Sequence, residues 1–123
     1  MTQPSHPFCY SELHTEDPAT ARQFYTALFS WPVTVHPLPA GEYTELQPGG
    51  AIGGGLLRGM FEGGRSQWVP YVAVEDLERF TARAKELGAR GVHELGTVPE
   101  QGRFSLLVDP AGAPFGLWQP LAK

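Results

Sequence analysis

The chain has 123 residues, a net charge of −4 and one cysteine, Cys9. This length suits a single compact domain, and one cysteine excludes an internal disulfide. The basic residues are scattered and offer no electrostatic surface for nucleic acid, and no apolar run approaches the roughly 20 residues that cross a membrane. The first residues lack the charged and apolar regions of a signal peptide, so we expect a cytoplasmic protein.

A strand is predicted from Phe8 to Thr15. Successive side chains of a strand point to opposite faces, so Tyr10, Glu12 and His14 share one face of it. Cys9 then falls on the other face and is expected to be a small buried side chain rather than a nucleophile. The polar face is therefore the first candidate for a functional surface.

A helix is predicted directly after this strand. Asp17 is a typical N-cap, and Pro18 is favoured at the first helical position because its missing N–H costs nothing there. Apolar residues at helical spacing predict one buried face, made of Ala21, Phe24, Tyr25, Leu28 and Phe29.

Three short strands are predicted next, at residues 33–38, 42–47 and 51–57. The pattern leaves open whether Tyr43 and Glu45, or Thr44 and Leu46, face the same way as the polar residues of the first strand. The glycines at 53–55 are unusual for a packed strand and indicate close backbone approach or open space. Residues 58–66 have the composition of an exposed linker.

The second half repeats this order. Placing Asp17 on Asp76, 59 residues later, aligns the first strand and helix with a strand at 68–74 and a helix at 76–87. Three more strands are predicted at 90–95, 103–108 and 113–119. The chain is therefore predicted to be α+β, with two βαβββ modules at about 6–58 and 67–120 in one domain over residues 1–123.

This arrangement resembles the vicinal oxygen chelate superfamily, which includes glyoxalase I, bleomycin-resistance proteins and extradiol dioxygenases. The residues that carry the resemblance are Asp17-Pro18 with Phe24-Tyr25, Tyr71 to Asp76, Leu87-Gly88, Gly102-Arg103-Phe104 and Asp109 to Gly112. It implies two curved mixed sheets around a ligand-binding cleft, and usually a dimer.

The resemblance also implies four metal-ligand positions, one on the first and one on the fourth strand of each module. Here they fall on Tyr10, Val69, Gly116 and the stretch 52–54. Divalent metals need several N, O or S donors, and none of these positions carries a usual one. We therefore expect no metal and no other cofactor. A different site, with Glu45 or His93 approaching Glu12 and His14, stays open.

By the same resemblance, six residues are predicted to contact a ligand: Tyr10, Glu12, His14, Tyr71, Phe104 and Trp118. Glu12 or His14 could act as a general base. The absence of side chains at Gly116 and at 53–55 could leave room for a bulkier organic ligand, or leave a shallow empty cleft. Trp31 and Trp68 are expected to pack under the helices or at an interface.

Three functions follow as hypotheses. The first is metal-independent binding of a small organic molecule, for example to sequester a toxic compound. The second is a lyase, isomerase or epimerase that uses Glu12 or His14 for proton transfer. The third is a vestigial cleft in a domain that acts through self-association or a protein partner. The expected assembly is a homodimer, with Trp68 or Met60-Phe61 as candidate contacts.

Overall fold

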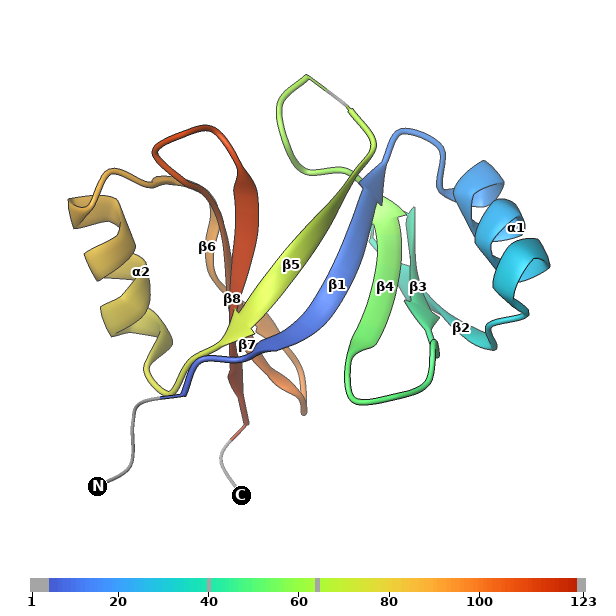
Figure 1. Ribbon diagram of the computed structural model, residues 1–123, viewed down its shortest axis with the longest axis horizontal. Coiled ribbons are helices and arrows are strands. Elements are labelled where there is room, and N and C mark those ends of the chain that lie inside the picture. Colours follow the sequence, from blue (N-terminus) through green and yellow to red (C-terminus); the bar gives the residue numbers. More distant parts are fainter. Residues whose placement is uncertain (1–4, 40, 64, 122–123) are drawn as a thin grey trace. The chain divides into compact units, whose positions relative to one another are not determined.

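Figure 1 shows the computed structural model, which describes residues 5–39, 41–63 and 65–121. The elements in chain order are β1 Phe8–Thr15, α1 Pro18–Phe29, β2 Val33–Leu38, β3 Gly41–Leu46, β4 Gly53–Arg58, β5 Gln67–Ala73, α2 Leu77–Glu86, β6 Arg90–Val98, β7 Gly102–Val108 and β8 Pro114–Pro120. The predicted order of strand, helix and three strands, repeated once, is confirmed. The ends of the predicted domain and residue 64 of the predicted linker lie outside the described residues.

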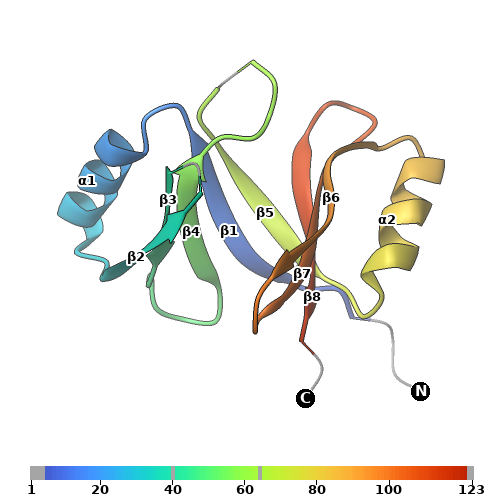
Figure 2. The same ribbon diagram turned by 180° about the vertical axis from the view of Figure 1, so that it is seen from behind.

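The chain divides into two compact units, residues 10–69 and residues 1–9 with 70–123. The strand order is β2-β3-β4-β1 in the first and β5-β8-β7-β6 in the second. In each unit the first strand pairs in parallel with the fourth, and the other pairs are antiparallel. Figure 2 shows one helix beside the strands of each unit, α1 in the first and α2 in the second.

The core of the first unit lies between its sheet and α1. Leu13, Leu46 and Leu56 are buried there, and Ala21 and Tyr25 of α1 pack against them. This side of the sheet is the helix-facing side, so the opposite side carries the residues that alternate with these leucines.

The predicted buried face of α1 is wrong in part. Phe24 and Leu28 are each 57% exposed, Phe29 is 51% exposed, and no residue of α1 is fully buried. The apolar stripe on α1 is wider than the surface that the sheet offers, so only its middle, at Ala21 and Tyr25, is covered. Phe29 instead stacks on Trp31 beyond the helix end, with ring centroids 4.7 Å apart.

In the second unit α2 packs more completely. Leu77 is fully buried with Val74, Leu107 and Leu117. Both helices begin as predicted, because Asp17 and Asp76 each accept a hydrogen bond from the backbone N–H three residues later. Neither helix has the length and apolar composition that a membrane span requires in the described parts of the chain.

Candidate functional site

The candidate site is built on the face of β1 that points away from α1. Because Leu13 belongs to the core under the helix, Tyr10, Glu12 and His14 lie together on the opposite face, as predicted. His14 is fully buried and Glu12 is 7% exposed, whereas Tyr10 is half-buried. A polar group can remain in such a place only when hydrogen bonds replace the water that it loses.

A continuous chain of hydrogen bonds supplies these partners. The Tyr10 hydroxyl lies 2.8 Å from the Gly54 carbonyl oxygen and 2.5 Å from the Tyr43 hydroxyl. Tyr43 donates to Glu12 Oε2 at 2.7 Å, and Glu12 Oε1 lies 2.7 Å from His14 Nε2. The chain of contacts therefore crosses three strands, from β4 through β1 and β3.

A backbone contact at the His14 end of this hydrogen-bond chain determines the tautomer of His14. The backbone N–H of Met60 donates to His14 Nδ1 at 3.3 Å, so Nδ1 acts as an acceptor and carries no hydrogen. The imidazole is then neutral, and its remaining hydrogen on Nε2 points to Glu12 Oε1. The Phe61 ring packs edge-on against this imidazole, with ring centroids 5.1 Å apart. Residues 60–61, predicted to be linker, thus hold the histidine in one tautomer.

The two phenols are neutral donors at ordinary pH. Burial raises the pKa of Tyr10, and burial together with the neighbouring Glu12 carboxylate raises the pKa of Tyr43. Two phenol hydrogens serve three contacts, to Gly54, between the phenols and to Glu12. An ionised Glu12 accepts from Tyr43, whereas a protonated Glu12 adds a hydrogen that lets each phenol donate toward Gly54. The hydrogens of these bonds can therefore take either of two arrangements, depending on whether Glu12 holds a proton.

The glycines of β4 make this arrangement possible. Tyr10 lies opposite Gly53 in the parallel pair of β1 and β4, and its ring covers that glycine. A Cβ at Gly55 would collide with Tyr43 and lie 2.5 Å from the Tyr10 hydroxyl oxygen. Tyr43 reaches Glu12 across β4 because Gly55 has no side chain. The expected open space at 53–55 is thus filled by two tyrosines from neighbouring strands.

The sequence alone leaves open which face of β3 carries Tyr43. Its alternation with Leu46, which lies in the core under α1, places Tyr43 and Glu45 on the polar face. A signal was present, since a tyrosine on one strand and glycines on the next often occur as a cross-strand pair. This signal identifies Tyr43 only once β3 is known to pair with the glycine-containing strand β4.

The second unit shows a related arrangement. Tyr71 lies opposite Gly116, and its ring occupies the space that a side chain at Gly116 would need. Phe104 and Trp118 are direct cross-strand neighbours on the same face of β7 and β8. Phe104 also stacks on the exposed His93, with ring centroids 5.0 Å apart.

The other polar candidates have separate partners. Glu45 pairs with His36 at 3.0 Å on the exposed surface. Cys9 lies 3.6 Å from the Tyr71 carbonyl oxygen, and burial raises the pKa of its thiol. Within the ranges that the structure describes, no three His, Cys, Asp or Glu side chains gather so that they could hold a metal ion.

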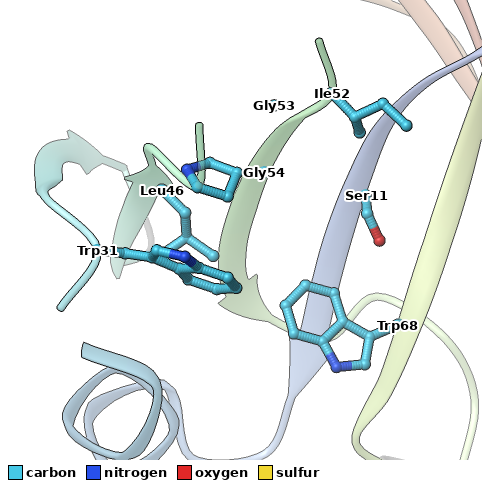
Figure 3. Close-up of a pocket in the computed structure, with 8 residues that line it drawn as sticks. Ser11, Trp31, Leu46, Ile52, Gly53, Gly54 and Trp68 are labelled. Carbon is cyan, nitrogen blue, oxygen red and sulfur yellow. The ribbon is translucent and has the colours of Figure 1, made fainter. Parts of the chain in front are cut away.

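A separate hollow of about 360 Å³ lies on the helix-facing side of the first unit. Figure 3 shows Trp31 and Trp68 on its walls, with Ser11 of β1 drawn above Trp68. Both tryptophans pack beside α1 as predicted, since Trp31 stacks near Tyr25 and Trp68 Nε1 donates to the Tyr25 hydroxyl at 3.2 Å. The hollow is lined mostly by apolar atoms and is separated from the polar chain by the thickness of the sheet.

Residues 11–118 match the family model described as a glyoxalase-like domain. The chain belongs to this family. "Putative glyoxylase CFP32" of Mycobacterium tuberculosis is 33% identical over 112 residues, which are 90% of this chain and 43% of that protein. "Anthracycline biosynthesis protein DnrV" of Streptomyces peucetius is 29% identical over 88% of this chain and 45% of its own length. The glyoxalase-like chain spans less than half the length of these curated relatives.

Solved structures agree on the fold. A protein of Bacillus halodurans, BH1468, has a TM-score of 0.71 at 13% identity, with 98% of each chain covered. Methylmalonyl-CoA epimerase from Mycobacterium tuberculosis has a TM-score of 0.66 at 17% identity, covering 94% of this chain and 88% of its own. The predicted α+β fold and superfamily are therefore confirmed.

Proposed function

We propose that this glyoxalase-like domain binds a small organic molecule without the metal of its family relatives, through the phenols of Tyr10 and Tyr43. The observation that carries the proposal is the hydrogen-bond chain from Gly54 to His14. Its two half-buried hydroxyls are the members that a ligand meets first, because Glu12 and His14 lie deeper. Both phenol hydrogens are used within this network, so a ligand carbonyl or other acceptor oxygen would bind by replacing the Gly54 carbonyl as the acceptor of the Tyr10 hydrogen.

The residues at the family's metal positions do not fit a metal. The Tyr10 hydroxyl is already engaged with Tyr43 and Gly54, Val69 is an apolar and fully buried side chain, and Gly116 lies under the Tyr71 ring. A divalent ion would have to displace these groups and would gain no imidazole or carboxylate at these positions. Metal analysis of protein purified without added metal tests this, and stoichiometric zinc, iron or nickel would contradict it.

Ligand-dependent thermal unfolding tests the binding itself, since a compound that binds only the folded state raises its stability. An anthracycline and methylmalonyl-CoA are the first probes, because one relative is an anthracycline biosynthesis protein and one structural neighbour is a methylmalonyl-CoA epimerase. Loss of one neutral hydrogen bond, worth about 0.5–1.5 kcal/mol, should weaken binding of the best compound about 2- to 12-fold in Tyr43→Phe. Tyr25→Phe is the matched control, since its hydroxyl bonds Trp68 on the helix-facing side.

Two results would count against this assignment. If Tyr10→Phe and Tyr43→Phe both bind like the wild type, the phenols do not hold the ligand. If Gly54→Val abolishes binding while the phenol variants keep it, the ligand occupies the hollow between Trp31 and Trp68, which Gly54 lines. Tyr71, Phe104 and Trp118 remain predicted ligand contacts in the other unit.

Proton transfer by Glu12 is the second candidate function. The observation in its favour is that Glu12 is bonded on one oxygen to a neutral His14 and on the other to Tyr43. An ionised Glu12 can accept a substrate proton by relay: the substrate proton goes to Tyr10, the Tyr10 hydrogen to Tyr43 and the Tyr43 hydrogen to Glu12, and the reverse shifts return it. Exchange of the C2 hydrogen of methylmalonyl-CoA for deuterium, followed by NMR, would report this chemistry. Exchange that disappears in Glu12→Gln and His14→Asn while binding persists would support catalysis, and binding without any exchange would refute it.

We also propose that the protein forms a homodimer and is located in the cytoplasm. The resemblance implies a homodimer, and sedimentation at several protein concentrations tests whether one forms. Sequestration of a toxic compound is one role that binding without turnover could serve.

A further inference from the structure

We propose that Glu45 determines which ligands the Tyr10 and Tyr43 hydroxyls accept, favouring molecules with a protonated amine and rejecting anions. This inference rests on the proposed binding function and names the ligand class of the same site. Glu45 is exposed and lies on the same face of β3 as Tyr43, two residues further along the strand. Its Oε1 atom lies 3.0 Å from His36 Nε2.

Glu45 and Glu12 stand in one row across three strands. Glu45 of β3 lies opposite Gly55 of β4, and Gly55 lies opposite Glu12 of β1. Neighbouring strands are about 4.8 Å apart, so about 10 Å of sheet separates the two glutamates, and their row has no side chain between them. The Tyr10 and Tyr43 hydroxyls take up that space, because a Cβ at Gly55 would collide with both. The phenols therefore lie between a buried and an exposed carboxylate.

The second unit has the matching row without the charges. Leu106 of β7 lies opposite Gly116 of β8, and Gly116 lies opposite Tyr71 of β5. Glycine therefore occupies the middle of both rows, but a fully buried leucine, Leu106, stands where the first unit has Glu45. The repeat shows that this fold accepts an apolar residue at that place. Glu45 is thus a feature of the first unit and not a requirement of the sheet.

The two carboxylates give this face a negative potential. Of the described residues that form β1 to β4, only Arg58 is a Lys or Arg, and it lies on the helix-facing side, where it donates to the Glu16 carbonyl oxygen at 2.8 Å. Burial raises the pKa of Tyr10, and the carboxylates of Glu12 and Glu45 raise it further. A ligand atom bonded to the Tyr10 hydroxyl lies in the same potential, which disfavours an anion and favours a cation.

An ammonium group can replace His36 beside Glu45. Both side chains of this pair are 48% exposed, and an exposed pair of this kind changes an equilibrium by about fivefold or less. A ligand with a carbonyl oxygen and an ammonium group would bond Tyr10 with the first and Glu45 with the second. A ligand carboxylate or phosphate would instead meet two carboxylates. The ligand class that fits is therefore an amine-bearing carbonyl compound.

Isothermal titration calorimetry with three probes tests the inference: an anthracycline with an aminosugar, the same compound with its amine acetylated, and methylmalonyl-CoA as the anion. The amine should bind the wild type more tightly than its acetylated form. Glu45→Gln should weaken binding of the amine about 2- to 5-fold and leave the acetylated compound unchanged. Glu45→Lys should weaken the amine further and strengthen methylmalonyl-CoA. Glu42→Gln is the matched control, since Glu42 lies on the helix-facing side of β3, 4.0 Å from Arg22, and it should bind like the wild type.

The outcomes separate the role of Glu45 from the binding site itself. Equal affinity for the amine and its acetylated form, or a preference that persists in Glu45→Gln, overturns the role of Glu45. The phenols remain the site in that case if Tyr43→Phe still weakens binding. If the wild type binds neither anthracycline, this inference and the use of the phenols for such ligands are both refuted. Far-ultraviolet circular dichroism and an unchanged melting temperature establish that each variant is folded.

Discussion

Replacing Gly55 by alanine tests the hydrogen-bond chain at the point where three strands meet. The new Cβ would lie 2.5 Å from the Tyr10 hydroxyl oxygen and 2.5 Å from Tyr43 Cζ, and it would overlap the Tyr43 hydroxyl. Both phenols would have to move away from β4. Tyr43 would then lose its contact with Glu12, and the contact between the two phenols would break.

The expected cost follows from two physical terms. Forcing an extra methyl group into a packed site costs about 1–3 kcal/mol, and leaving a buried polar group without its partner costs about 1–3 kcal/mol. The lower entropy of the unfolded chain returns about 0.4–1 kcal/mol for any Gly-to-Ala change. The net loss of unfolding free energy should therefore be about 1–5.6 kcal/mol.

Urea unfolding followed by tryptophan fluorescence measures this loss. Gly54→Ala is the matched control on the same strand, because its Cβ would meet nothing closer than 3.4 Å, at Leu46 Cβ and the Ser11 carbonyl oxygen. Its stability should change by less than about 1 kcal/mol. In a Tyr43→Leu background the penalty of Gly55→Ala should shrink, since the main obstacle is gone. Equal stability of the two alanine variants would refute the packing of tyrosine across Gly55.

Three further predictions concern single groups. Tyr43→Phe should lower the unfolding free energy by about 1–2 kcal/mol in urea titrations, because Glu12 loses a donor, whereas the exposed bond of Tyr25 makes Tyr25→Phe nearly neutral. Because burial raises the pKa of Tyr10 and Tyr43 above their unfolded value near 10, their contribution to stability is complete below about pH 10 and declines above it. Removing one phenol should make this alkaline decline less steep, and an unchanged slope would argue against burial of the pair. Asp17→Ala should cost about 1 kcal/mol through loss of the α1 N-cap, measurable as a lower melting temperature.

Local patterns were enough to predict the elements and the polar face of β1. Alternation in β1 places Tyr10, Glu12 and His14 together, and the structure has them on one face because Leu13 packs under α1. Both N-caps depend on a single aspartate and its next three residues, so they could be predicted as well. Patterns of this kind involve only residues that are close together in the sequence, so they can be recognised without the structure.

The width of the buried face of α1 could not be predicted in the same way. The spacing of Ala21, Phe24, Tyr25 and Leu28 gives an apolar stripe but does not say how much of it a sheet will cover. In the structure Ala21 and Tyr25 contact the core, and Phe24 and Leu28 remain exposed. The spacing thus predicts the helix and its apolar side, and the packing of the sheet decides how much of that side is covered.

The glycines show most clearly why the site needed the structure. From the sequence alone, Gly53, Gly55 and Gly116 suggest room for a ligand, because the resemblance implies side chains there in metal-binding relatives. Read across the strands, Gly53 and Gly116 lie opposite Tyr10 and Tyr71, whose rings occupy that room. In both units a tyrosine ring thus covers a glycine of the neighbouring strand, and Tyr43 adds a second ring over β4. A glycine in a strand is therefore evidence about its cross-strand partner before it is evidence about a cavity. The structure therefore places tyrosine rings over Gly53, Gly55 and Gly116, and these rings, rather than open space, are what a ligand of the kind we propose would meet.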